Sequence, residues 1–205
     1  MATRSIPRLE QSSSALFLCD IQERFTKAIH EFDNMAKASS KLLRGAQILE
    51  IPVFTTEQNS KALGSTVDVL KKDIPENSTI VDKTRFSMVL DDGTTDKWLR
   101  DHKVQNVMIV GIESHVCVLQ TTLDLLKKGF NVFIIRDAIS SCNKQEVPLA
   151  IERMRLAGAT ITTSESALFE LMLDSKHPHF KAISGLIKTE KDSTKAALEA
   201  LTSRI

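Results

Sequence analysis

Six short, almost wholly apolar runs recur along the chain and alternate with stretches whose apolar residues have helical spacing. Five of the runs fall at residues 15–20, 51–57, 78–83, 106–111 and 131–138, and the sixth lies inside 159–166. Strands that are apolar on both sides are typical of a parallel sheet covered by helices on each face. Right-handed crossovers between such strands give a doubly wound sandwich. The pattern therefore predicts an α/β fold of three layers around a parallel sheet.

The stretches between these runs predict helices over 37–50, 94–102, 116–128, 144–158 and 166–174. With 205 residues, we expect one domain over 1–205, with a frayed polar segment at 1–13 and a helical tail at 178–205. Residues 58–77 form the longest irregular stretch. They are interpreted either as a lid over a site or as a plain surface excursion.

Composition narrows the classes of function. The net charge of +1 gives no bulk electrostatic reason to bind nucleic acid or a membrane surface, and no apolar run is long enough to cross a bilayer. Three cysteines without a CxxC pair favour a reducing compartment, which predicts a cytoplasmic protein. The final residues Ser203-Arg204-Ile205 loosely resemble a peroxisomal address, or are an arbitrary helix end.

Ligands of open α/β sheets bind beyond the carboxyl ends of the strands, so the polar residues at those ends are the candidate site residues. They come from five strands and are listed by strand: Asp20, then Glu57 and Gln58, then Lys83, then Gly111 to Cys117, and finally Asp137. An acid, a base and a thiol, distant in sequence, are therefore predicted to meet at one edge of the sheet.

Cys117 lies where the fourth strand passes into a helix. Unpaired N–H groups and the helix dipole at such a position favour a thiolate, and a nearby ammonium favours it further. The same N–H groups can stabilise the oxyanion that forms when a thiolate attacks a carbonyl. The alternative is that Cys117 is a small buried hydrophobic residue, as many free cysteines are.

Asp20 and Lys83 have two interpretations each. Asp20 closes the apolar run "ALFLCD", where a carboxylate needs a partner or faces a cavity. It is either a general base or a cap for the turn that follows it. Lys83 is either part of the same site or a solvated residue at the end of a strand. The convergence of both residues with Cys117 favours the functional interpretation.

Three separated segments, "FLCDIQERF", "VDKTRFS" and "VGIESHVCVLQTTLDLLKKG", resemble in sequence and order the isochorismatase-like cysteine hydrolases. The resemblance extends from about residue 14 to 175. A fourth segment, "TEQNSKALG" at 56–64, resembles the second-strand loop of the isochorismatase domain-containing group.

The resemblance implies a sheet order of 3-2-1-4-5-6, self-association into a homo-oligomer and a catalytic set of Asp20, Lys83 and Cys117. It also implies an oxyanion hole from the backbone N–H groups of Glu113 and Cys117, and a cis peptide bond between Ile112 and Glu113. Further residues expected to line the pocket are Gln22, Phe25, Gln58 and Phe86, although phenylalanines near a sheet edge are more often core. His115 is interpreted as a rim or interface residue, because residues two apart on a helix do not face each other.

The departures from the family pattern shape the predicted chemistry. Amide-cleaving members carry a metal-binding Asp/His cluster after the second strand, but this sequence has no histidine from 31 to 101. No catalytic metal and no cofactor are therefore expected. The vinyl-ether-cleaving branch lacks the cysteine, so Cys117 favours a small substrate with an amide-like C–N bond, cleaved through a covalent acyl-enzyme. The alternatives are a partner-binding protein with a relic pocket, or cleavage of a vinyl ether or of a phosphodiester in RNA.

Overall fold

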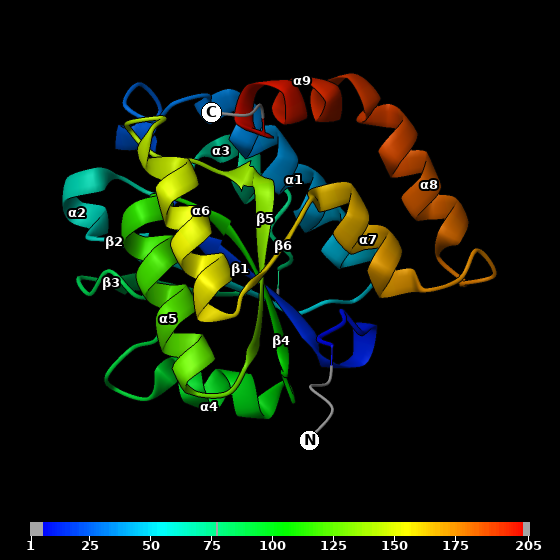
Figure 1. Ribbon diagram of the computed structural model, residues 1–205, viewed down its shortest axis with the longest axis horizontal. Coiled ribbons are helices and arrows are strands. Elements are labelled where there is room, and N and C mark those ends of the chain that lie inside the picture. The colour runs from blue at the N-terminus through cyan, green and yellow to red at the C-terminus, as the bar shows by residue number, and fades with distance from the viewer. Residues whose placement is uncertain (1–5, 77, 203–205) are drawn as a thin grey trace.

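The computed structural model describes residues 6–76 and 78–202 (Figure 1). Six parallel strands form one sheet in the order β3-β2-β1-β4-β5-β6. Their bounds are β1 (Ser14–Cys19), β2 (Val53–Gln58), β3 (Thr79–Lys83), β4 (Asn106–Gly111), β5 (Asn131–Ile139) and β6 (Thr160–Thr162). The fold class and the strand order are both confirmed.

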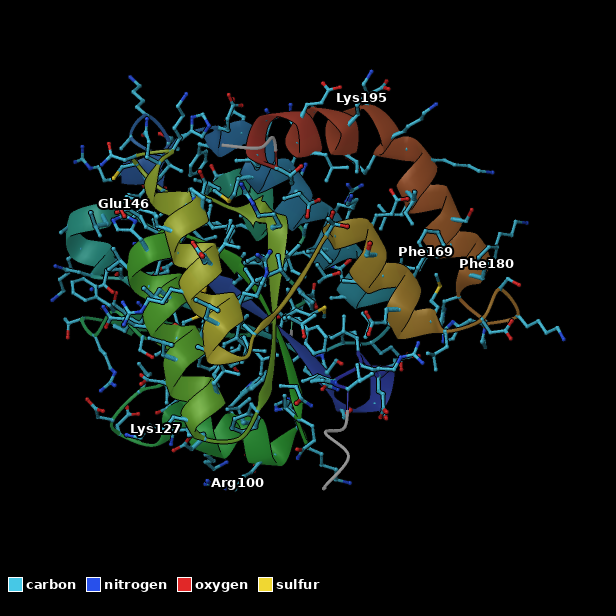
Figure 2. All side chains as sticks on the ribbon, viewed as in Figure 1. Arg100, Lys127, Glu146, Phe169, Phe180 and Lys195 are labelled. Atoms are coloured by element: carbon cyan, nitrogen blue, oxygen red, sulfur yellow. The ribbon has the colours of Figure 1, made fainter. Side chains whose placement is uncertain are left out.

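Helices cover both faces of the sheet (Figure 1). One face carries α1 (Phe32–Ile48), α7 (Ser164–Met172), α8 (Phe180–Thr189) and α9 (Lys191–Thr202). The other carries α4 (Thr94–Asp101), α5 (Leu119–Lys127) and α6 (Glu146–Ala157). Two short helices, α2 (Ser60–Leu63) and α3 (Asp68–Lys71), lie between β2 and β3. Charged side chains such as Glu146 on α6 and Lys195 on α9 lie on the outer surface (Figure 2).

Each face of the sheet has its own apolar core, and β1 contributes to both. Leu16 and Leu18 pack toward α1, whereas Phe17 and Cys19 pack toward α4, α5 and α6. Successive side chains of a strand point to opposite faces, so a fully buried strand must be apolar throughout. This alternation places Cys19 in the same core cluster as Cys117.

Several expected boundaries differ from the structure. Helix α1 begins at Phe32, five residues before the expected start at 37. The expected helix 116–128 opens as a single π-helical turn, Ser114–Val118, before α5. Residues 58–76 are no free excursion, because Val67 and Leu70 are buried in the core on the α1 face of the sheet and the Thr66 N–H donates to Glu57.

The expectation of a frayed segment over 1–13 is wrong for residues 9–13. Leu9 is fully buried and its N–H donates to Glu170 at 2.9 Å. The side chain of Gln11 bonds both the Leu49 carbonyl and His177. These partners lie far away in the sequence, and no local pattern indicates them.

The C-terminal region is helical as expected, and α9 packs against α1. The tripeptide Ser203-Arg204-Ile205 lies outside the described residues. No helix among residues 6–76 and 78–202 has the length and apolar character needed to cross a membrane.

Candidate active site

The carboxyl ends of three neighbouring strands bring together an acid, a base and an amide. Asp20 directly follows β1, Gln58 ends β2, and Lys83 ends β3, where it is the register partner of Gln58. The Lys83 ammonium lies 2.7 Å from Asp20 Oδ2 and 2.8 Å from Gln58 Oε1. Because parallel strands end at one edge, strand register brings these three residues together.

The carboxylate of Asp20 is buried and held from several sides. Oδ1 accepts a hydrogen bond from the Thr56 hydroxyl at 2.8 Å, and the Cys19 thiol lies 3.6 Å from Oδ2. Its backbone has φ of 52°, in the left-handed region that non-glycine residues seldom occupy. Strained backbone of this kind is concentrated at functional sites.

Lys83 is fixed in place by the turn that follows it. Its ammonium donates to the backbone carbonyls of Arg85 at 3.1 Å and Phe86 at 3.0 Å. Burial disfavours its charged form, but the neighbouring acidic groups of Cys19, Asp20 and Cys117 outweigh burial, so the pKa of Lys83 lies above its usual value. Lys83 is therefore an ammonium at every physiological pH.

Cys117 lies in the π-helical turn after β4, and only 7% of the residue is exposed. The Thr121 hydroxyl donates to the Cys117 carbonyl at 2.7 Å and accepts the Met88 N–H at 2.9 Å. Thr121 thus joins the turn that carries Cys117 to the segment that follows Lys83. Single π-helical turns are frequent at functional sites.

The two buried thiols are neighbours. Burial, a hydrogen bond with Cys117 and the charge of Asp20 together raise the pKa of Cys19 well above its usual value. Among the described residues, no hydrogen bond joins the Cys117 thiol directly to Asp20 or Lys83. The Cys19 thiol, which lies 3.6 Å from Asp20, is also 3.3 Å from the Ile112 carbonyl.

The turn between β4 and Cys117 has an unusual backbone. The peptide bond between Ile112 and Glu113 is cis. In the part of the chain that the structure describes, the Glu113 N–H has no hydrogen-bond acceptor, whereas the next N–H, of Ser114, donates to the Ser140 carbonyl at 2.8 Å. Gly111 precedes the turn with φ of 118°, and a Cβ there would lie 2.0 Å from the Cys19 carbonyl oxygen.

The other residues expected in the pocket have varied surroundings. Gln22 is fully buried and clamps the loop after β2, donating to the carbonyls of Gln58 and Gly64. Phe25 is half-buried and packs against the core on the α1 face of the sheet, while Phe86 is 49% exposed. His115 is half-buried, with Nδ1 3.0 Å from the Ser141 hydroxyl.

One residue assigned to this edge belongs elsewhere, and two residues of the site were not identified from the sequence. Asp137 lies within β5, where its carboxylate accepts the N–H of Ser164 at the start of α7. Thr56 and Cys19 contact Asp20, but the sequence did not predict them as site residues because each lies inside an apolar run. Their one signal in the sequence was their place within two residues of a strand end.

Comparison with known proteins identifies the family. The isochorismatase domain family matches residues 14–166 of the chain. The chain belongs to the isochorismatase family. It is 41% identical over 192 residues to isochorismatase family protein 1B of Dictyostelium discoideum, covering 92% of this chain and 93% of that one. It is 40% identical to isochorismatase domain-containing protein 2 of Xenopus laevis, covering 90% and 88% of the two chains.

Among solved structures, the MAR1 ribonuclease of Caenorhabditis elegans has the same fold, with a TM-score of 0.85 and 46% sequence identity. The match covers 89% of this isochorismatase-family chain and 93% of that protein. The resemblance to the family that the sequence indicated is therefore confirmed.

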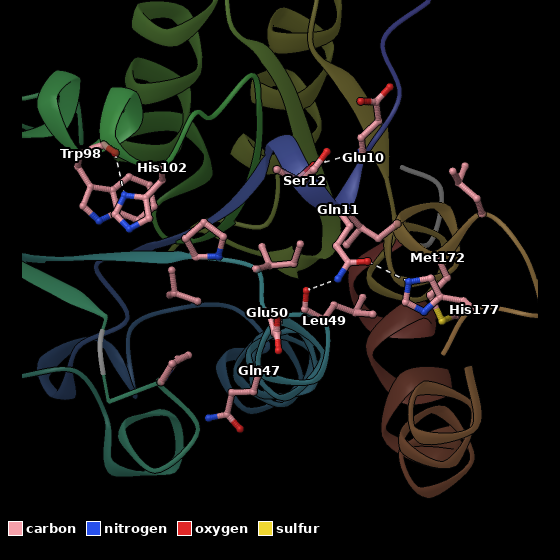
Figure 3. Close-up of a pocket in the computed structure, with 18 residues that line it drawn as sticks. Glu10, Gln11, Ser12, Gln47, Leu49, Glu50, Trp98, His102, Met172 and His177 are labelled. Atoms are coloured by element: carbon pink, nitrogen blue, oxygen red, sulfur yellow. Dashed lines mark hydrogen bonds between the residues drawn. The ribbon is translucent and has the colours of Figure 1, made fainter. Parts of the chain in front are cut away.

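A hollow of about 1010 Å³ lies at the opposite, amino end of the strands (Figure 3). It is lined by the N-terminal segment, the end of α1 and the side chains of His102 and His177. The Gln11 side chain links Leu49 to His177 across it. Asp20, Lys83 and Cys117 do not line this hollow, so its size does not mark it as the place of their chemistry.

Proposed function

We propose that this isochorismatase-family protein is a hydrolase of a small amide-like substrate, with Cys117 as nucleophile, Asp20 as general base and Lys83 as the fixed counter-charge. The observation that supports it is a buried carboxylate with an ammonium 2.7 Å away and, also beside it, the Cys19 thiol, which neighbours Cys117. A structural ion pair needs no thiol beside it. A nucleophile needs a nearby base, and this arrangement supplies one.

The proposed reaction has two stages. Asp20 takes the proton of the Cys117 thiol, and the thiolate attacks the substrate carbonyl. The C–N bond breaks as Asp20 returns that proton to the leaving amine, which leaves a thioester on Cys117. Asp20 then deprotonates a water that attacks the thioester, and the carboxylic acid departs as the thiol is restored. Lys83 holds the Asp20 carboxylate in place through the ion pair of 2.7 Å.

Developing negative charge on the substrate oxygen would be stabilised by the N–H groups of Glu113 and Cys117. The Glu113 N–H has no acceptor within the described residues, so it is available to a substrate oxygen. Removal of one donor of this kind typically costs about 100-fold or more in kcat. No catalytic metal or cofactor enters this mechanism.

A panel of small amides tests the proposal. We expect turnover by the wild type and its loss in Cys117→Ala and Asp20→Asn, with an acyl adduct on the Cys117 peptide detectable by mass spectrometry. Asp68→Asn is the matched control, because this carboxylate is 94% exposed on α3. Undiminished turnover in Cys117→Ala and Asp20→Asn would overturn the mechanism.

A second candidate function is cleavage of a phosphodiester bond in RNA, favoured by the 46% identity to a protein named as a ribonuclease. The net charge of +1 counts against it, as does Arg85, whose guanidinium pairs with Asp91 and Asp124. Hydrolysis by water activated at Asp20 requires no thiol. RNA cleavage that persists in Cys117→Ala and is lost in Asp20→Asn would therefore support this candidate over amide hydrolysis.

The non-catalytic alternative, a partner-binding protein with a relic pocket, predicts an inert site. In that case iodoacetamide would modify Cys117 no faster than a model thiol at any pH, and no member of the substrate panels would be consumed. The enzymatic proposal predicts faster modification of Cys117, measured on its own peptide because Cys142 is an exposed third thiol.

We also propose self-association. Leu149 and Leu156, seven residues apart on one face of α6, are 63% and 82% exposed. Phe169 on α7 is 41% exposed. Light scattering should give a mass above 22.8 kDa that falls in the Leu149→Ser/Leu156→Ser variant. A monomeric wild type would contradict the proposal.

A cytoplasmic location is the proposal that fits three free cysteines. Fluorescent fusions that leave the C-terminus free or blocked distinguish it from a peroxisomal location, which requires the free C-terminal tripeptide.

A further inference from the structure

Three metal-ligating side chains meet beside the turn that carries Cys117. Glu113 and His115 come from this turn, and Cys142 comes from the loop after β5. One ligand atom from each lies within 4.8 Å of the other two. A thiol, an imidazole and a carboxylate gathered from two loops have no structural requirement to be so close. We propose that Glu113, His115 and Cys142 bind a divalent cation of the zinc class, with water as the fourth ligand.

The ligand set suits such a cation. Sulfur and imidazole nitrogen prefer zinc and its neighbours over Mg²⁺ or Ca²⁺, which take oxygen ligands. Three protein ligands leave a fourth tetrahedral position open to water. Tetrahedral bonds of zinc to S, N and O require ligand atoms about 3.3–3.8 Å apart. The three side chains therefore need to close in by roughly 1 Å, and Cys142 is exposed and free to rotate.

A second layer of contacts already orients two of the ligands. The Ser141 hydroxyl lies 3.0 Å from His115 Nδ1, which leaves Nε2 available to a metal. The Cys142 N–H donates to Glu113 Oε2 at 2.8 Å and leaves the other carboxylate oxygen available. Hydrogen bonds of this kind fix the ring and carboxylate of metal ligands in known sites.

The ligand set is open to solvent on the side of Cys142, which is exposed. Glu113 and His115 are half-buried beside the exposed Cys142, which gives the ion a path from solvent.

The site differs from a catalytic metal centre after β2, where residues 31–101 offer no histidine. It also does not depend on the proposed hydrolysis, because its three ligands stand outside the acid, base and nucleophile. Its position on the Glu113 turn means that a bound cation would hold that turn fixed.

Cobalt(II) titration of the reduced protein under nitrogen tests the inference. We expect one Co²⁺ per chain, with thiolate-to-cobalt charge transfer in the near ultraviolet and the intense visible bands of tetrahedral cobalt. Cys142→Ser should lose the charge-transfer band, and His115→Ala should weaken binding by about 10-fold or more. The two control variants, Cys117→Ser and His177→Ala, should bind Co²⁺ as the wild type does.

Thermal unfolding with Zn²⁺ gives a second readout. The midpoint should rise in the wild type and in Cys117→Ser but stay unchanged in Cys142→Ser, whose exposed side chain leaves the fold intact. A charge-transfer band that persists in Cys142→Ser, or that disappears in Cys117→Ser, would overturn the proposal. So would the absence of any cobalt spectrum at millimolar metal.

Discussion

The Lys83 ammonium and the Asp20 carboxylate form an ion pair of 2.7 Å, and each side chain is only 1% exposed. Sixty-three residues separate them in the sequence. Two charges removed from water are costly unless each has its partners. Here Asp20 also accepts from Thr56, and Lys83 also donates to Gln58 and to two backbone carbonyls. The pair is fully satisfied, so the removal of either member leaves the other as a buried, unpaired charge.

We therefore predict that Lys83→Met lowers the free energy of unfolding by about 3–5 kcal/mol, the usual result of breaking a buried pair. The double variant Asp20→Asn/Lys83→Met should lose less than the sum of the single variants, because neither charge remains. Urea unfolding followed by circular dichroism measures all four proteins.

The exposed pair Lys97–Asp101 on α4 is the matched control, with side chains 73% and 53% exposed. Lys97→Met should change the stability little, because water screens this pair. If Lys83→Met unfolds with the same midpoint as Lys97→Met, the Asp20–Lys83 pair is not the buried contact described here.

The sequence located Asp20 and Lys83 because both end apolar runs, and strand ends of a parallel sheet share one edge. It could not locate Cys19 as a neighbour of Cys117. When a strand is apolar on both faces, alternation no longer shows which side each residue faces. Only the helices that pack on each face, which the sequence does not assign, decide that Cys19 lies on the Cys117 side.

The segment before β1 shows a second limit of prediction from sequence. Polar composition predicted fraying, yet Leu9 is buried and bonded to Glu170, 161 residues away. Contacts at such separations depend on the assembled fold. The start of α1 at Phe32 was not predicted, and the reason is local. Glu31, at the N-cap position, has φ of 53° and makes no capping hydrogen bond with its side chain, so the sequence carries no capping signal there.

Two glycines should respond to the same substitution in opposite ways. Gly111→Ala should destabilise the protein severely, since its Cβ would lie 2.0 Å from the Cys19 carbonyl oxygen at φ of 118°. Gly185 lies inside α8 with open space around its Cβ position, so Gly185→Ala should stabilise by about 0.5–1 kcal/mol. Thermal unfolding compares them, and equal effects of the two variants would contradict the close approach of β1 and β4.

Cys19 should be chemically silent in the folded protein. Burial, the bond with Cys117 and the charge of Asp20 raise its pKa, so at pH 7–8 it is a thiol rather than the reactive thiolate. Iodoacetamide should therefore leave the Cys19 peptide unmodified at these pH values, in the wild type and in Cys117→Ala alike. Modification in urea, where the thiol is exposed, is the internal control. Rapid labelling of Cys19 in the folded protein would make it, rather than Cys117, the candidate nucleophile.

Lys41 is a buried lysine on α1, 1% exposed, whose ammonium donates to the Thr194 hydroxyl at 2.7 Å. Burial lowers its pKa below the usual 10.5, although Asp137, Glu165 and Glu190 oppose the shift. Because the folded state disfavours the charge, Lys41→Met should stabilise the protein relative to the wild type more at pH 7 than at pH 10.5.

The pH dependence follows from the direction of that shift. Between the lowered pKa of the folded state and 10.5, the unfolded chain binds the Lys41 proton more strongly, so wild-type stability rises with pH in that window. The advantage of Lys41→Met should therefore be full below the folded-state pKa and shrink as pH approaches 10.5. Lys37→Met, at an exposed position of the same helix, should show no such pH-dependent difference. Urea unfolding of the three proteins from pH 7 to 10.5 measures this. If the stability of Lys41→Met relative to the wild type instead rises with pH, the three carboxylates outweigh burial.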